Sequence, residues 1–100
     1  MQPLIEQNLA QIQALCRKYQ VRLLEAFGSA ARGNFKPTSD VDFLVLFQKT
    51  GQGKVDRFFD LLHELEQLLG RKVDLVDITA ASNPYFLAEA LRHRVKLYAA

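Results

Sequence analysis

The chain has 100 residues, of which 49% are hydrophobic and 24% are charged, and its 13 basic and 11 acidic side chains give a net charge of +2. This length fits one domain over residues 1–100, and the hydrophobic fraction excludes a disordered chain. A net charge of +2 is too small to predict nucleic-acid binding by itself. The single cysteine excludes an intrachain disulfide and a thiolate zinc site, and without a secretory signal or a long apolar run we expect a cytoplasmic protein with no membrane partner.

The first predicted element is a helix at about residues 4–19. Its apolar face is formed by residues spaced three or four apart, which are Ile5, Leu9, Ile12, Cys16 and Tyr19. Because Cys16 lies on this face, we expect a buried thiol and not a nucleophile. A short apolar segment at residues 21–27 ends at Gly28 and predicts the first strand.

The next stretch combines turn chemistry with the clearest strand. Residues 29–32 predict the first turn of a short helix, and residues 33–39 predict a loop. Residues 40–47 predict a strand, because apolar side chains alternate along it. We assign Val41, Phe43, Val45 and Phe47 to one face, and Asp40, Asp42, Leu44 and Leu46 to the other.

The second half of the chain continues the alternation of helix and strand. A helical pattern runs from Val55 to Leu69 and ends at Gly70, a strand follows at residues 73–77, a further helix runs from Pro84 to about Arg92, and a short strand occupies residues 95–98. This order predicts an α/β or mixed α+β domain, with one sheet and helices packed on it. Pairs of basic residues at 17–18, 71–72 and 92 with 94 fall where we expect helices to end, where cations complement the helix dipole. The alternative for residues 92–96 is a contact with phosphate or with an acidic partner.

Asp40 and Asp42 carry the first chemical signal. Two residues apart on one strand face, they stand roughly 6.6 Å apart along the chain. Carboxylates at that separation can bind one hard cation, or a pair about 3.5 to 4 Å apart, and Mg²⁺ accepts a few carboxylates together with substrate phosphates. The alternative is a pair of solvated residues at the end of a loop.

Gly28 and Ser29 carry the second signal, which is a phosphate site. Gly28 lets the backbone approach a phosphate closely, and Ser29 supplies a hydroxyl next to the amides of the following turn. Arg32, one helical turn further on, can reach the same anion, whereas Lys36 and Ser39 are weaker candidates. A tight turn with a capping serine is the alternative interpretation.

A third acidic residue is expected to complete a metal site, and Asp74 is the favoured candidate. It interrupts an apolar strand, where a carboxylate is costly unless it is paired or bound to a metal. Asp77 lies at the strand end, where a solvated or capping role is cheap, and Glu25 precedes the glycine. His63 and His93 have no nearby partners that indicate a catalytic triad, so we interpret both as structural or surface residues.

Three segments resemble the minimal nucleotidyltransferase family of the DNA polymerase β superfamily: residues 28–33 (Gly-Ser-Ala-Ala-Arg-Gly), residues 39–45 (Ser-Asp-Val-Asp-Phe-Leu-Val) and residues 73–76 (Val-Asp-Leu-Val). The spacing between Gly-Ser and Asp-x-Asp is typical of that family. The resemblance implies the nucleotidyltransferase fold, a small mixed β-sheet with helices packed on it, and Mg²⁺-dependent transfer of a nucleoside monophosphate from ATP with release of pyrophosphate. It implies metal binding by Asp40 and Asp42, a third carboxylate from Asp74 that helps to activate the acceptor hydroxyl, and triphosphate binding by Gly28 and Ser29.

Small prokaryotic proteins of this type resemble antitoxins that are encoded beside a HEPN-domain ribonuclease toxin and silence it by adenylylating a tyrosine. The leading hypothesis is therefore a protein adenylyltransferase antitoxin, with a HEPN toxin as partner and a hetero-oligomer as a possible assembly. Larger relatives carry an extra domain that binds the acceptor, so we expect a partner protein to present the acceptor here. Two alternatives stay open: an antitoxin that neutralises by binding alone, and a transferase that acts on a small molecule or an RNA end.

Overall fold

A four-stranded mixed sheet forms the centre of the computed structural model, which describes residues 3–28, 40–49, 53–80 and 94–100. The strands are β1 (Val21–Phe27), β2 (Val41–Phe47), β3 (Val73–Asp77) and β4 (Arg94–Ala99), in the spatial order β3-β2-β1-β4. β1 is antiparallel to β2 and to β4, whereas β2 and β3 are parallel. All four strands were predicted from the sequence, and the mixed α+β class is confirmed.

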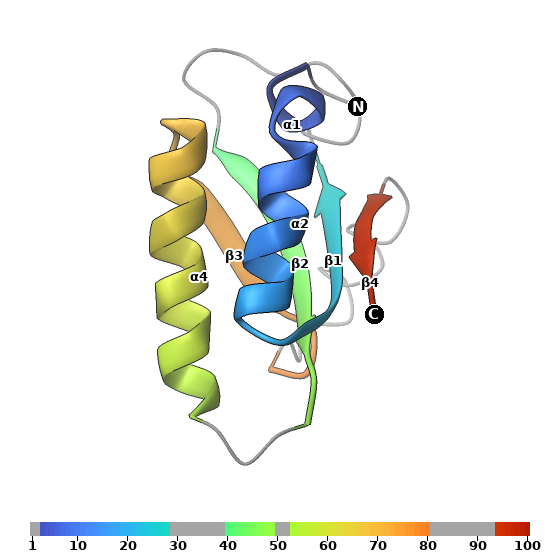
Figure 1. Ribbon diagram of the computed structural model, residues 1–100, viewed down its shortest axis with the longest axis vertical. Helices are drawn as coiled ribbons and strands as arrows, with labels where there is room; N and C mark the ends of the chain where they lie inside the picture. The colour runs from blue at the N-terminus through green and yellow to red at the C-terminus, as the bar shows by residue number, and fades with distance from the viewer. Residues whose placement is uncertain (1–2, 29–39, 50–52, 81–93) are drawn as a thin grey trace.

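Three described helices cover one face of this sheet: α1 (Pro3–Gln7), α2 (Leu9–Lys18) and α4 (Lys54–Leu69). Figure 1 shows α2 and α4 side by side in front of the strands. α4 connects β2 to β3, which allows these two strands to run parallel. The short helix predicted at residues 29–32, the loop at 33–39 and the helix predicted to end at Arg92 lie outside the described residues.

The single helix predicted at residues 4–19 is wrong in one respect, because the structure breaks it at Asn8. Asn8 has φ −111° and ψ 11°, and its side-chain amide donates a hydrogen bond of 2.8 Å to the carbonyl of Leu4. Asparagine side chains compete with the backbone for such carbonyls, so they favour a local turn over a continuous helix. The apolar face nevertheless survives the break, since Ile5, Ile12 and Cys16 are all fully buried.

α4 ends where the sequence predicts. Gly70 adopts the left-handed conformation with φ 64°, and its N–H donates to the carbonyl of Glu66 at 2.9 Å. Leu61, Leu65 and Leu69 form the buried stripe of the helix, whereas Val55 at its N-terminal end is 69% exposed. The predicted apolar pattern is therefore longer than the surface that the helix buries.

The main core lies between the helices and the sheet. It contains the four apolar residues that the sequence assigns to one face of β2, together with apolar residues of the other elements, and it includes Val41, Phe43, Val45, Phe47, Leu24, Ala26, Leu75 and Leu97. A smaller apolar cluster, formed by Phe27 and Leu44 with Val76 and Ile78 packed against them, lies on the opposite face. The alternation predicted for β2 is confirmed, and it directs Asp42 to the face that α2 and α4 do not cover.

The basic residues divide into two groups. Arg17 and Lys18 lie in the last turn of α2, as predicted, where they complement the helix dipole. Arg94 was predicted to lie at a helix end, and this is wrong, because it is the first residue of β4 and its guanidinium forms an ion pair of 3.3 Å with Glu25.

Cys16 is buried as expected, and burial raises the pKa of its thiol to about 12 although Arg17 opposes the shift. Among the described residues, no helix is long and apolar enough to span a membrane.

Candidate active site

The parallel pairing of β2 and β3 brings two carboxylates together. Asp42 and Asp74 occupy the same register position on the two neighbouring strands. Side chains at one register position point to the same face of a sheet, and neighbouring strands lie roughly 4.8 Å apart. Two residues distant in sequence therefore stand next to each other on the face that the helices leave uncovered.

Asp40 joins this pair from the residue immediately before β2. It is exposed, and it lies two positions ahead of Asp42, so both side chains project to the same side of the strand. Burial, followed by the negative charges of Asp74 and Asp40, raises the pKa of Asp42 from 3.8 to about 6. The three carboxylates thus interact electrostatically, as one cluster of negative charge.

Gly28 forms the corner beside this cluster. Ala26 lies opposite Phe43 in the antiparallel ladder, so the chain leaves β1 at Gly28 close to the start of β2. Gly28 has φ +64°, and a Cβ built on it would lie 2.9 Å from the Asp42 Oδ2 atom. Glycine is therefore required both by the backbone conformation and by the close approach of the Asp42 carboxylate.

Asp74 and Asp77 differ in their surroundings. Asp77 forms an ion pair of 2.8 Å with Lys54 and accepts hydrogen bonds from the N–H and hydroxyl of Thr79. Burial acts to raise the pKa of Asp77, but these hydrogen bonds outweigh it and lower the pKa below its ordinary value. Asp77 therefore has the capping role that the sequence suggested, while Asp74 has no such partner among the described residues and stands beside Asp42.

The structure differs in two respects from the metal site that the sequence predicts. Asp74 is exposed, so the cost of burying a carboxylate in an apolar strand is not the reason for its presence. The side chains of the described residues form no group of three His, Cys, Asp or Glu that could hold a metal as they stand. The register of β2 and β3 brings Asp42 and Asp74 together, and Asp40 precedes Asp42 by two residues.

The remaining predicted site residues lie outside the described residues: Ser29, Arg32, Lys36, Ser39 and His93. His63 is described, and it lies exposed on α4, as expected of a surface residue.

Glu25 and Arg94 form a second polar feature on this face, which the sequence does not predict. Glu25 is only 5% exposed, and it pairs with Arg94 across the β1–β4 ladder. The two residues are 69 positions apart, so no local pattern signals the contact. The only hint in the sequence is an acidic residue inside an otherwise apolar strand, which must find a partner.

The geometry defines what the site can do chemically. A glycine corner after a strand lets the backbone approach an anion closely, and carboxylate oxygens such as those of Asp40, Asp42 and Asp74 are ligands that hard divalent cations prefer. A negatively charged substrate that carries its own cation, such as a metal-bound nucleoside triphosphate, fits both halves.

Comparison with known families agrees with this class of site. Residues 10–100 match the family model described as polymerase beta, nucleotidyltransferase, so the chain belongs to this nucleotidyltransferase family. It is therefore an enzyme of the nucleotidyltransferase class.

Individual proteins and solved structures that resemble this chain give more specific comparisons. A Methanocaldococcus jannaschii protein provisionally named a protein adenylyltransferase is 38% identical over 68 residues, which is 68% of this chain and 68% of that protein. A chain from a toxin–antitoxin crystal structure with AMP-PNP superimposes with a TM-score of 0.75 and 27% identity, over 93% of this chain and 74% of that one. A chain from the complex of the tri-AMPylated Shewanella oneidensis HEPN toxin with an MNT antitoxin gives a TM-score of 0.69 and 25% identity, over 95% of this chain and 72% of that one.

Proposed function

We propose that this chain is an antitoxin that transfers AMP from ATP to a hydroxyl of a HEPN-domain toxin, with a tyrosine as the acceptor. Residues 1–100 act as one catalytic domain, and the toxin supplies the acceptor. The similarity to a toxin–antitoxin complex with AMP-PNP supports ATP as the donor, and the similarity to a complex with an AMPylated HEPN toxin supports a protein acceptor.

One observation carries the proposal. The Gly28 corner lies against the Asp42 carboxylate, and Asp42 lies in register with Asp74. This arrangement supports a triphosphate site at the glycine corner beside a cluster of oxygen donors, with residues that come from three strands. A pair of solvated residues at a strand end does not require a glycine whose added Cβ would lie 2.9 Å from the Asp42 Oδ2 atom, so that alternative explains less.

The donor set fits Mg²⁺ as the cofactor. Burial and the two acidic neighbours raise the pKa of Asp42 to about 6. The ionised form of this carboxylate is therefore unfavourable unless a cation lies beside it. We propose that Asp40, Asp42 and Asp74 hold the cation, which offsets charge on the triphosphate and lowers the pKa of the acceptor hydroxyl when bound.

Each residue then has a stated role. Gly28, Ser29 and Arg32 bind and orient the triphosphate, and the Asp42 carboxylate stays ionised beside them. Asp74 accepts a hydrogen bond from the acceptor hydroxyl and aligns its oxygen with the α-phosphorus. The hydroxyl oxygen forms the new bond to that phosphorus as its proton passes to the Asp74 carboxylate, the bond from the α-phosphorus to the oxygen bridging to the β-phosphate breaks, and pyrophosphate leaves with the electron pair.

Intact-protein mass spectrometry tests the proposal. The purified HEPN toxin, incubated with this chain, ATP and Mg²⁺, should gain the mass of one or more AMP groups. Asp42→Asn should abolish the gain, whereas Glu6→Gln, which neutralises an exposed acid on α1, should leave it unchanged. A toxin that remains unmodified by the wild-type chain refutes the transfer, and a toxin that Asp42→Asn still silences indicates neutralisation by binding alone.

A further inference from the structure

Glu25 and Arg94 lie on the same face of the sheet as the carboxylate cluster, which is the face that the described helices leave uncovered. Leu24 and Ala26 belong to the main core, so Glu25 between them points to the opposite face. Arg94 pairs with Phe27 in the β1–β4 ladder, and Phe27 belongs to the apolar cluster of that opposite face. Arg94 therefore projects to the same side as Glu25, and its Nη1 atom donates to the Glu25 Oε1 atom at 3.3 Å.

The backbone register brings Arg94 next to the glycine corner. Its partner in the ladder, Phe27, is the residue immediately before Gly28. Paired residues of antiparallel strands have Cα atoms about 4.5–5.5 Å apart, so the two chains are close at this point. In the strand order β3-β2-β1-β4, the corner thus has Asp42 on one side, from β2, and Arg94 on the other side, from β4.

This order of residues across the sheet matches the direction of the proposed reaction. In phosphoryl transfer, the attacking and leaving oxygens lie roughly in line, on opposite sides of the phosphorus. Asp74, the proposed partner of the acceptor hydroxyl, lies on β3, on the far side of Asp42 from the glycine corner. The pyrophosphate must then leave in the opposite direction, toward β1 and β4. Arg94 lies on that side of the site.

The Arg94 guanidinium keeps donors for a second acceptor. A guanidinium has several N–H donors in a rigid planar fork, and the fork matches phosphate as well as carboxylate. Among the described residues, Arg94 forms one ion pair, in which Nη1 is the donor to Glu25. The Arg94 side chain is 46% exposed whereas that of Glu25 is 6% exposed. The carboxylate is therefore enclosed, while the cation it holds can still contact a ligand.

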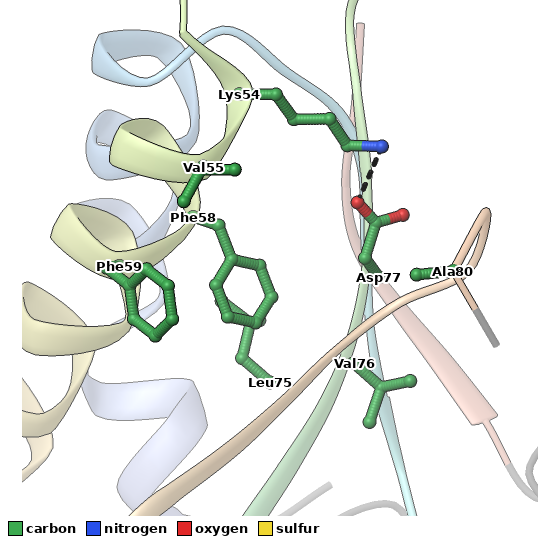
Figure 2. A pocket seen from close by; sticks show the side chains of 8 residues that line it. All are labelled: Lys54, Val55, Phe58, Phe59, Leu75, Val76, Asp77 and Ala80. Atoms are coloured by element: carbon green, nitrogen blue, oxygen red, sulfur yellow. Dashed lines mark ion pairs between the residues drawn. The ribbon is translucent and has the colours of Figure 1, made fainter.

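Two other basic side chains near the sheet are less suitable for this contact. Figure 2 shows the ammonium group of Lys54 against Asp77, beside the hollow between α4 and β3 on the helix side of the sheet. Lys96 shares the uncovered face with Arg94, but it lies two residues further along β4, away from the glycine corner. Among the described residues, Arg94 is thus the cation best placed to reach an anion at the corner.

We propose that Arg94 binds the β- and γ-phosphates of ATP and stabilises the leaving pyrophosphate, and that Glu25 is the positioning residue that orients its guanidinium. This inference rests on the proposed function, since it adds a nucleotide-binding residue to the site of AMP transfer. The attraction within a buried ion pair is largely offset by desolvation, so stability alone does not explain Glu25 in an apolar strand. A carboxylate that holds the guanidinium in place reduces the entropy lost when the nucleotide binds.

Calorimetric titration of the purified chain, without toxin, tests the inference with two ligands. AMP-PNP carries groups equivalent to the β- and γ-phosphates and AMP does not, so the contact should affect AMP-PNP alone. In the presence of Mg²⁺, Arg94→Gln should raise the Kd for AMP-PNP about 10-fold and leave the Kd for AMP unchanged. Lys96→Gln removes a positive charge from the same strand and face, so it is the matched control and should bind both ligands as the wild type does.

A double variant separates a lost phosphate contact from a folding defect. Arg94→Gln leaves the buried Glu25 carboxylate without its partner, whereas Arg94→Gln combined with Glu25→Gln removes both charges. An affinity for AMP-PNP that stays low in the double variant supports the phosphate contact. An affinity that recovers in the double variant overturns it, as does an equal loss of affinity for AMP in Arg94→Gln.

The same measurements distinguish this inference from the proposed function. If Arg94→Gln binds AMP-PNP as the wild type does while the wild type modifies the toxin, the role of Arg94 is overturned and the transfer reaction stands. If AMP-PNP binding depends on Arg94 but the toxin is never modified, the phosphate contact stands and the transfer reaction is refuted. A wild-type chain that does not bind AMP-PNP overturns both.

Discussion

Replacing Asp42 with asparagine should make the protein more stable while it removes the activity. Asp42 is partly buried beside Asp74 and Asp40, and its pKa rises from 3.8 to about 6. A raised pKa means that the folded protein holds the proton more tightly than the unfolded chain does. Ionised Asp42 therefore opposes folding at neutral pH, and an uncharged asparagine of the same shape removes that opposition.

The size of the effect follows from the pKa shift. Between pH 3.8 and about 6 the folded state is protonated and the unfolded state is not, so stability falls as the pH rises through this window and stays reduced above it. Two pKa units correspond to about 3 kcal/mol. Because Asp42 is only partly buried, solvent screening reduces this ceiling, and we expect a gain of about 1–2 kcal/mol for Asp42→Asn at pH 7–8.

Urea unfolding in the presence of EDTA, repeated from pH 4 to pH 8, measures the gain. The stability difference between Asp42→Asn and the wild type should be near zero at the acid end and should reach its full value above pH 6. Asp60→Asn, which changes an exposed acid on α4, is the control and should show no such pH dependence. A difference that is independent of pH, or an Asp42→Asn variant less stable than the wild type at pH 8, refutes the reasoning. Added Mg²⁺ should stabilise the wild type and leave Asp42→Asn unaffected.

Three further variants test the surroundings of the site. Gly28→Ala should destabilise the fold by about 1–2 kcal/mol, because the left-handed backbone strains any side chain. It should also abolish AMP transfer, because the added methyl group displaces the Asp42 carboxylate. Transfer at the wild-type rate contradicts this prediction. Arg57→Met should cost about 1–3 kcal/mol in urea unfolding, since it removes hydrogen bonds to two backbone carbonyls but keeps an apolar stem; an unchanged midpoint contradicts this. Glu25→Gln should lower the thermal midpoint, since it leaves Arg94 without its buried anionic partner. The double variant Glu25→Gln with Arg94→Gln should recover part of this loss. Equal midpoints in the single and double variants contradict the pairing.

The pattern of apolar residues and the residues that end helices predicted most of the fold. The four strands follow from short apolar segments, of which residues 40–47 alternate with period two, and the end of α4 follows from Gly70, whose left-handed backbone few other residues tolerate. These signals are local, so they can be read from neighbouring residues alone. The break at Asn8 was not predicted, because the apolar spacing continues across it and only the side-chain bond to the Leu4 carbonyl shows the competition.

The site was predicted from residue types, and its assembly depends on the pairing of strands. Asp42 and Asp74 lie opposite each other only because β3 pairs in parallel with β2 in one particular register. A shift of one residue would turn Asp74 to the helix face, and no feature of either strand alone fixes that register. The ion pair of Glu25 with Arg94 depends in the same way on the pairing of β1 with β4, so local patterns could not reveal it.

The distribution of cations explains why the carboxylate cluster should bind a metal strongly. Two basic side chains on nearby elements are already committed: Arg94 is held by Glu25 at 3.3 Å, and Lys54 is held by Asp77 at 2.8 Å. Among the described residues, none of the three clustered aspartates forms an ion pair, and burial, followed by the negative charges of Asp74 and Asp40, raises the pKa of Asp42. A divalent cation relieves the repulsion between these charges in the folded state alone, so its binding free energy should add to the stability of the fold. The acids that weaken the fold without a cation are thus the same acids that should bind it, which links the stability prediction for Asp42 to the proposed chemistry.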